Sequence, residues 1–163
     1  MAKEIERKFI VKDEFKSQAF SSSHIIQGYI CRESGRTVRV RIRDEKGYLT
    51  IKGPSDKKGI SRYEFETEIS YEDAEQLIKL CPGGTINKRR YLVKSGIHLF
   101  EIDEFYEKNT GLIMAEVELH NENETFIKPP FIGKEVTGDK RFYNSCLLKN
   151  PYAKWGKDFE REP

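Results

Sequence analysis

The chain has few of the residues that cross-link small proteins or bind transition metals. Its 163 residues include three cysteines, three histidines and one tryptophan. Cys31, Cys81 and Cys146 are widely spaced and odd in number, which predicts neither a disulfide framework nor a CxxC metal knuckle. The histidines also lack the spacing of a metal site. We therefore expect reduced thiols, as in a cytoplasmic protein.

Long hydrophobic runs are also missing. No apolar stretch approaches the ~20 residues that a membrane-spanning helix needs. The N-terminus is charged within its first three residues and has no apolar segment typical of a signal peptide. The expected location is the cytoplasm, without a membrane partner.

Two families of phosphate-transferring enzymes are excluded because their motifs are absent from the sequence. The sequence has no GxxxxGK[ST] loop, so it does not encode a P-loop enzyme. It also lacks a Cys-x5-Arg motif and a serine-centred nucleophile motif. A covalent phosphoenzyme is therefore not expected.

The two signs of charge nearly cancel, with 34% charged residues and a net charge of +2. A nucleic-acid-binding protein would show a basic excess or a basic stripe. No nucleic-acid partner is therefore expected. The charges are instead separated by segment, which indicates a site inside the fold.

Alternation of polar and apolar residues runs through most of the chain and predicts β-strands. The range 37–43 is the clearest case, because Val38, Val40 and Ile42 alternate there with Arg39, Arg41 and Arg43. Strands are predicted over 4–11, 24–32, 37–43, 48–52, 62–69, 85–94, 97–106 and 112–120. A hairpin is expected at 44–47 and a mobile loop at 53–59.

Helices are predicted at three places between and after these strands. Ser70 is suited to cap a helix that Pro82-Gly83-Gly84 ends. A short helix is expected over 121–127, and Asp139 is expected to cap a last helix through Leu148. The predicted organisation is one domain over 1–150, of a size that allows a fair core, and a polar tail over 151–163.

The polar faces of these strands carry like charges. Glu4 and Glu6 share one strand face about 7 Å apart, and such pairs are destabilising on a sheet. A meander with one solvated face is one interpretation of the pattern. The other is a closed barrel with its charged faces inside, where buried ions must be paired or bind metals.

The two sets of charges suit two ligands. Carboxylates are hard oxygen donors that favour Mg²⁺ or Mn²⁺ over zinc, and they are Glu4, Glu6, Glu64, Glu66, Asp103, Glu116 and Glu118. The cations suit a polyanion, and they are Arg39, Arg41, Arg43, Lys52, Lys88 and Arg90. Together they predict a metal–polyphosphate site with metal-assisted direct attack by water.

The segment Glu4-Ile5-Glu6-Arg7-Lys8 matches the ExExK signature of the CYTH superfamily, the triphosphate tunnel metalloenzymes. Further motifs follow in family order, and the resemblance covers residues 1 to about 145. These motifs are Gln27-Gly28-Tyr29, Arg39-Val40-Arg41, Thr50-Ile51-Lys52, Glu64-Phe65-Glu66, Lys88-Arg89-Arg90-Tyr91, Glu101-Ile102-Asp103, Glu116-Val117-Glu118, Glu135-Val136-Thr137 and Lys140-Arg141-Phe142. The chain is most similar to short bacterial members related to inorganic tripolyphosphatases.

The resemblance implies a mainly β, α+β fold: an eight-stranded antiparallel closed β-barrel around a charged tunnel, with flanking helices. It implies two Mg²⁺ or Mn²⁺ ions held by Glu4, Glu6, Glu64, Asp103, Glu116 and Glu118. The implied substrate contacts are Lys8, Arg39, Arg41, Lys52, Lys88, Arg90 and Arg141, and the implied catalytic set is Glu4, Glu6, Lys8 and Lys88.

Family members share these motifs but differ in activity, so several functions stay open. The favoured one is hydrolysis of inorganic tripolyphosphate to pyrophosphate and phosphate. The alternatives are a thiamine or nucleoside triphosphatase, a class IV-type adenylate cyclase, and a polyphosphate-binding module without catalysis. The expected partner is a small triphosphate-containing molecule, and both a monomer and a homodimer are compatible with the sequence.

Overall fold

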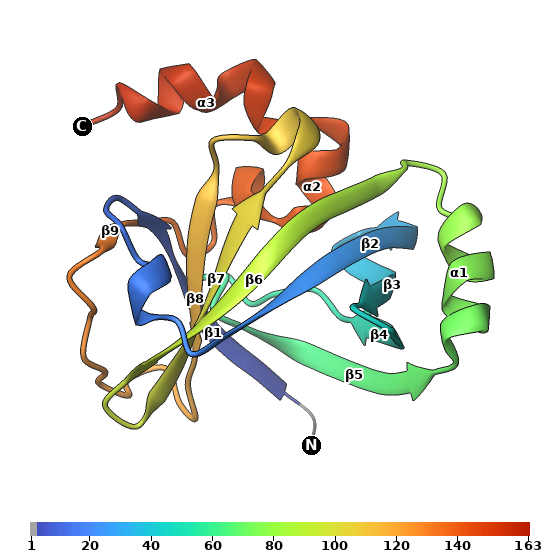
Figure 1. Ribbon diagram of the computed structural model, residues 1–163, viewed down its shortest axis with the longest axis horizontal. Coiled ribbons are helices and arrows are strands. Elements are labelled where there is room, and N and C mark those ends of the chain that lie inside the picture. The colour runs from blue at the N-terminus through green and yellow to red at the C-terminus, as the bar shows by residue number, and fades with distance from the viewer. Residues whose placement is uncertain (1–2) are drawn as a thin grey trace.

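A closed antiparallel barrel of eight strands forms the body of the protein in this computed structural model, which describes residues 3–163 (Figure 1). The strands are β1 (Lys3–Val11), β2 (Ser21–Glu33), β3 (Arg36–Arg43), β4 (Lys46–Lys52), β5 (Ser61–Ile69), β6 (Thr85–Ser95), β7 (His98–Phe105) and β8 (Ile113–Glu118). The sheet runs in the order β5-β4-β3-β2-β6-β7-β8-β1, and β1 pairs with β5 to close it. The predicted fold class is confirmed.

A ninth strand lies outside the barrel. Strand β9 (Ile132–Glu135) pairs with the edge of β1 opposite β8, with Phe9 opposite Glu135. The sequence pattern did not predict it, because four residues are too few to show a clear alternation.

The barrel reverses the usual arrangement of polar and apolar faces. On β1, Glu4, Glu6 and Lys8 share the inner face, while Phe9 points outward into the apolar core. That core lies between the barrel and the segments that cover it, and it includes Phe15, Phe100 and Phe131. Burying these rings outside the barrel leaves the interior free for charged side chains.

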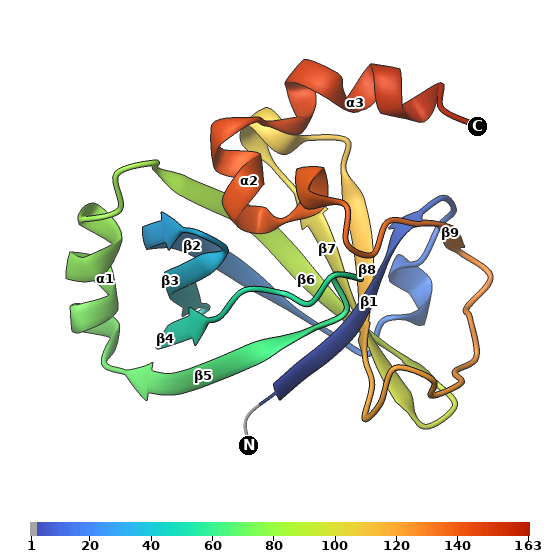
Figure 2. The same cartoon turned by 180° about the vertical axis from the view of Figure 1, so that it is seen from behind.

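Helix α1 (Tyr71–Lys79) packs on the outer face of β3 and β4 (Figures 1 and 2). The Ser70 hydroxyl accepts the Asp73 backbone N–H, as a helix cap does. Close packing requires glycine at position 47, where a Cβ would lie 2.6 Å from Cβ of Ala74. The predicted cap and helix both form.

The chain after β8 differs from the prediction in two places. Residues 121–123 form a turn and 124–127 an irregular segment in place of the predicted helix. The Glu124 carboxylate ties this segment down, because it accepts the His120 backbone N–H and bonds His98. The predicted last helix is broken into a 3-10 helix, Lys140–Phe142, and α2 (Asn144–Lys149). The break lies at Tyr143, whose backbone is extended with φ −69° and ψ 132°.

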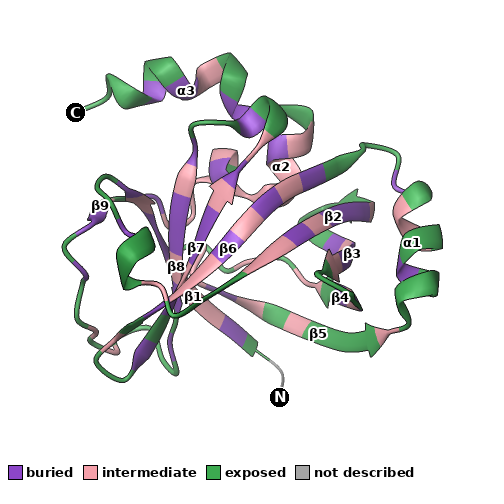
Figure 3. Ribbon diagram, in the orientation of Figure 1, coloured by how far each residue is buried: buried purple, intermediate pink, exposed green. Residues whose placement is uncertain are grey.

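The C-terminal segment forms a helix where a polar tail was expected. Helix α3 (Tyr152–Glu160) buries Tyr152 and Phe159 and exposes its other face (Figure 3). The ring of Phe159 lies 5.0 Å from that of Phe142, edge to face. These rings join an apolar cluster with Phe105 and Met114 from the barrel strands.

Two further 3-10 helices, Lys16–Gln18 and Glu107–Asn109, complete the elements. In the described part of the chain, no helix is long and apolar enough to cross a membrane.

The packing of α3 gives a first prediction. A Cβ added at Gly156 would lie 2.5 Å from the Tyr152 ring, and overpacking of this kind costs about 1–3 kcal/mol. Alanine regains about 1 kcal/mol of helix propensity. We therefore expect Gly156→Ala to lose about 1 kcal/mol, a fall of roughly 2–4 °C in Tm. Thermal denaturation measures this fall in Tm, and Lys154→Ala, at an exposed position on α3, is the control. An unchanged or higher Tm for Gly156→Ala would mean that α3 is not packed as described.

Candidate active site

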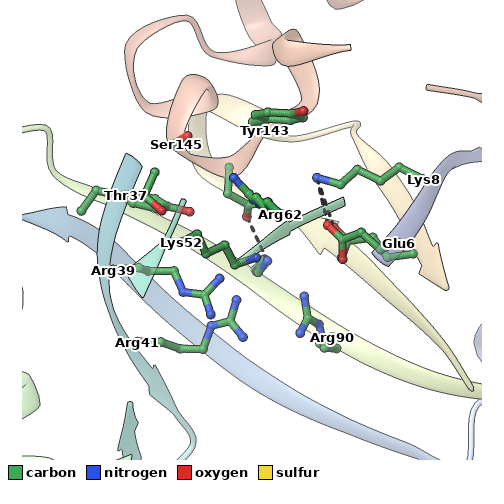
Figure 4. A pocket seen from close by; sticks show the side chains of 14 residues that line it. Glu6, Lys8, Thr37, Arg39, Arg41, Lys52, Arg62, Arg90, Tyr143 and Ser145 are labelled. Carbon is green, nitrogen blue, oxygen red and sulfur yellow. Dashed lines mark hydrogen bonds and ion pairs between the residues drawn. The ribbon is translucent and has the colours of Figure 1, made fainter. Parts of the chain in front are cut away.

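A small cavity of about 40 Å³ lies inside the barrel (Figure 4). Among residues 3–163, seven cationic side chains line it against two carboxylates, Glu6 and Glu116. The cations are Lys8, Arg39, Arg41, Lys52, Arg62, Lys88 and Arg90. The strong positive excess predicts an anionic ligand with several charges.

Three arginines lie side by side: Arg39 pairs with Glu66 and Arg90 with Asp103 and Glu101, while Arg41 has no carboxylate partner among the described residues. Figure 4 shows the guanidinium groups of Arg39, Arg41 and Arg90 pointing into the same space. Burial, together with Arg39 and Arg90, lowers the pKa of Arg41 to about 9. The Arg41 Nε donates to Gln27 Oε1 at 2.8 Å, which fixes the guanidinium in place.

An unpartnered donor marks the same place. Within the described chain, Arg39 Nε and Ser61 Oγ are the buried side-chain polar atoms that find no hydrogen-bond partner. A buried donor without a partner is costly, and an anion in the cavity would supply the acceptor. The arginine group is therefore ready for ligand oxygens.

Lys88 and Arg90 share the carboxylate of Asp103. Arg90 donates from Nε and Nη2 at 2.8 and 2.9 Å, and Lys88 Nζ donates at 2.7 Å. Although burial opposes it, these two cations lower the pKa of Asp103 well below its usual range. Asp103 is 1% exposed and fully engaged, so it positions the cations instead of facing the cavity.

Lys88 is the most deeply buried cation of the site. Its Nζ also donates to Asn144 Oδ1 at 2.9 Å. Burial, reinforced by Arg90 and Arg41 and opposed by Asp103, lowers the pKa of Lys88 to about 7. Near neutral pH this amine can therefore both hold and release a proton.

Lys8 lies between two carboxylates from neighbouring strands. Its Nζ is 3.5 Å from Glu6 Oε1 and 3.8 Å from Glu116 Oε1. Burial, Glu116 and then Glu4 raise the pKa of Glu6 to about 8, against the opposing effect of Lys8. One lysine therefore does not neutralise this carboxylate pair.

A second carboxylate pair lies beside the first. Lys52 Nζ contacts Glu4 Oε2 at 2.9 Å and Glu64 Oε2 at 3.5 Å, and Arg62 Nε contacts Glu4 Oε1 at 3.4 Å. Burial and Glu4 raise the pKa of Glu64 to about 7. The nearby Glu118 also has a raised pKa, because of burial, Glu4 and Glu101. This end of the site has an excess of negative charge.

The carboxylates fit a hard divalent cation without forming a finished cage. In the described chain, no three histidine, cysteine or carboxylate residues converge as a metal-binding group. Instead Glu6–Glu116 and Glu4–Glu64 are like-charged pairs in which one member, Glu6 or Glu64, has a raised pKa, and a cation relieves such repulsion. Magnesium keeps several waters and takes further oxygens from substrate phosphates, so a partial protein shell suits it.

Two arginines from the sequence analysis lie away from the cavity. Arg141, implied as a substrate contact, is bonded to Asp139 and Glu162 at 2.7 and 3.1 Å and lies over the rings of α3. Arg43, on the same strand face as Arg41, is exposed and bonded to the Tyr48 hydroxyl. The other predicted substrate contacts all line the cavity.

The structure adds residues that the sequence patterns missed. Arg62 lies two positions before Glu64 on β5, so the same alternation could have identified it. Tyr143, Asn144 and Ser145 come from the segment that begins α2, and no strand pattern could place them against the barrel.

Comparison with known proteins agrees with this architecture and charge arrangement. Residues 2–143 match the CYTH domain, and the chain therefore belongs to the CYTH family. An inorganic triphosphatase of Acetivibrio thermocellus is 49% identical over 154 residues, which are 93% of this chain and 97% of that protein.

Two further relatives extend the comparison. An inorganic triphosphatase of Nitrosomonas europaea is 34% identical over 149 residues, 88% of this chain and 95% of that protein. A solved crystal structure of an inorganic triphosphatase matches with a TM-score of 0.65 at 32% identity, covering 91% of this chain and 95% of the other.

Proposed function

We propose that this protein hydrolyses inorganic tripolyphosphate to pyrophosphate and phosphate. The observation that supports this proposal most strongly is the lining of the small cavity, where seven cations and two carboxylates meet among the described residues. A bare triphosphate carries several negative charges along a short chain and matches that excess. The relatives known as inorganic triphosphatases support the same substrate.

The proposed role of the cations is to bind and orient the phosphate chain. Arg39, Arg41 and Arg90 offer planar groups that bind phosphate oxygens in a bidentate way. Holding the chain in one orientation removes much of the entropic part of the barrier. Lys88, with its pKa near 7, would donate a proton from Nζ to the oxygen that leaves as the P–O bond breaks.

A divalent cation, Mg²⁺ or Mn²⁺, completes the proposal. Triphosphatases of the CYTH family are generally metal-dependent. Glu6 and Glu116 would hold one ion beside the cavity, and Glu4, Glu64 and Glu118 a second. When bound, the ions would polarise phosphate oxygens and favour attack by water. Asp103 would act only through Lys88 and Arg90, which occupy its carboxylate.

Steady-state kinetics with several substrates tests the proposed function. With Mg²⁺, we expect kcat/KM for tripolyphosphate to exceed that for ATP and for thiamine triphosphate by at least about tenfold, and no cyclic AMP from ATP. Cyclic AMP as the main product, or a higher kcat/KM for an organic triphosphate, would contradict it.

Metal binding can be tested without measuring activity. A ligand at about ten times its Kd stabilises the folded state by ~1.4 kcal/mol. We therefore expect Mg²⁺ to raise Tm by roughly 3–6 °C over the protein in EDTA. Glu116→Gln should lose most of this shift. Glu135→Gln, a carboxylate paired with Arg7 outside the barrel, should keep it; equal shifts in both variants would remove Glu116 from the proposed metal site.

A further inference from the structure

A larger cavity of about 660 Å³ adjoins the small one. The two share Thr37, Arg62, Tyr143 and Ser145 in their linings. A third space of about 10 Å³, beside Glu4 and Glu6, is also lined by Arg62 and Tyr143. Tyr143 and Arg62 are thus the side chains at which all three spaces meet.

The larger cavity, called here the outer cavity, is suited to attract anions. In the described part of the chain, two acidic residues, Glu33 and Asp56, line it. Its cationic lining residues are Arg32, Arg36, Lys57, Arg62, Lys140 and Lys149. Such a field raises the local concentration of anions in the outer cavity.

The ring of Tyr143 is held in place from several sides. Lys8 Nζ lies 4.6 Å from the ring centre and the Arg62 guanidinium 5.5 Å, both within cation–π range. The Tyr143 hydroxyl lies 3.3 Å from Ser55 Oγ, in the loop between β4 and β5. Figure 4 shows the ring above Lys8 and Arg62, on the side of the pocket opposite Arg39, Arg41 and Arg90.

Two glycines bring this loop against the turn before Tyr143. A Cβ at Gly59 would lie 2.3 Å from Cα of Gly138 and 3.3 Å from the Tyr143 hydroxyl. Both glycines have positive φ, 72° and 80°, a conformation that other residues rarely adopt. This backbone contact brings the loop that carries Ser55 against Tyr143 at the boundary between the cavities.

We propose that Tyr143 determines which triphosphates the tunnel accepts. The inference rests on the proposed function, with the triphosphate chain in the small cavity. A bare triphosphate needs no further space, whereas an organic triphosphate carries a group on its terminal phosphate that must lie in an adjoining cavity. The outer cavity has the volume for a nucleoside, and Tyr143 lines both this cavity and the small one, so its ring lies at the boundary between them. The ring therefore selects against nucleotides.

Two substitutions test the proposal. Tyr143→Ala opens this boundary, and we expect the ratio of kcat/KM for ATP to kcat/KM for tripolyphosphate to rise at least tenfold. Tyr143→Phe keeps the ring and removes only the hydroxyl, so the ratio should stay within about threefold of the wild type. Should the alanine variant fail to fold, Tyr143→Leu serves instead, with an expected rise of at least threefold.

Two outcomes would overturn the proposal. One is a parallel loss for both substrates with an unchanged ratio, which is the signature of a structural residue. The other is an equal rise in Tyr143→Phe, which would assign the selectivity to the hydroxyl.

Binding separates this inference from the proposed function. Calorimetry measures Kd for tripolyphosphate and for the non-hydrolysable adenosine 5′-(β,γ-imido)triphosphate. The ratio of these two Kd values reports the selectivity without turnover. If the wild type hydrolyses nothing, the proposed function fails, but a tenfold gain for the nucleotide in Tyr143→Ala still supports the selective role of Tyr143. An unchanged Kd ratio refutes it.

Discussion

Glu6→Gln is expected to lower kcat for tripolyphosphate at least about 100-fold, or ~2.7 kcal/mol of transition-state stabilisation. The amide keeps the size of the side chain and removes the charge that a divalent cation requires. Glu6 lies 3.5 Å from Lys8 and lines the small cavity, so the substitution removes a charge from the proposed metal site.

The same change should stabilise the metal-free protein in a pH-dependent way. The pKa of Glu6 is raised from 4.5 to about 8 by burial and by Glu116, so the folded state binds this proton more tightly than the unfolded chain. The stability that this proton contributes is full below pH 4.5 and is lost as the pH rises to 8. Glutamine does not ionise, so the stability of Glu6→Gln relative to the wild type increases as the pH rises.

Thermal denaturation in EDTA at pH 5 and pH 8 measures this effect. We expect the Tm of Glu6→Gln to exceed that of the wild type by at least about 3 °C at pH 8, corresponding to ~1 kcal/mol, and by less at pH 5. A large fall in Tm with kcat preserved would show that Glu6 is structural.

Arg41→Ala should reduce kcat/KM for tripolyphosphate by at least about 2 kcal/mol, or ~30-fold, the range of a hydrogen bond to a charged group. Arg41 is 7% exposed, and its Nε is already held by Gln27, so the other nitrogens are free to bind phosphate oxygens. Arg41→Lys should recover only part of the loss, because an ammonium does not bind two oxygens side by side.

Arg43 offers a matched control on the same strand. It follows Arg41 by two residues on the same face, but it is exposed and bonded to Tyr48 outside the cavity. Arg43→Ala should change kcat/KM by less than about threefold, the size of a weak surface contact. Comparable losses in the two variants would place the substrate away from the small cavity.

Much of the barrel could be predicted from the sequence, because period-two alternation fixes which side chains share a face. On β3, the alternation of Val38 and Val40 with Arg39 and Arg41 already puts both arginines on one side. That the charged side is the interior follows from the closure of β1 on β5, a contact between residues some 60 positions apart that no local pattern encodes. The resemblance to the CYTH superfamily supplied that step.

The remaining site residues depend on tertiary packing. Tyr143 reaches the barrel because the backbone is extended between two short helices, which a continuous helix from Asp139 would not allow. Arg141 carries the right charge, but Asp139 and Glu162 bind it outside. Tyr152, Trp155 and Phe159 are spaced i, i+3 and i+7, the pattern of one helix face, so the sequence itself could have indicated α3 where a polar tail was predicted.

The most direct test of the account is a ³¹P NMR time course with purified protein, excess tripolyphosphate and Mg²⁺. We expect many turnovers, with pyrophosphate and phosphate appearing in equal amounts, and no reaction in excess EDTA. Tripolyphosphate that stays intact for hours, while calorimetry shows that it binds tightly, would contradict the account and identify a binding module instead.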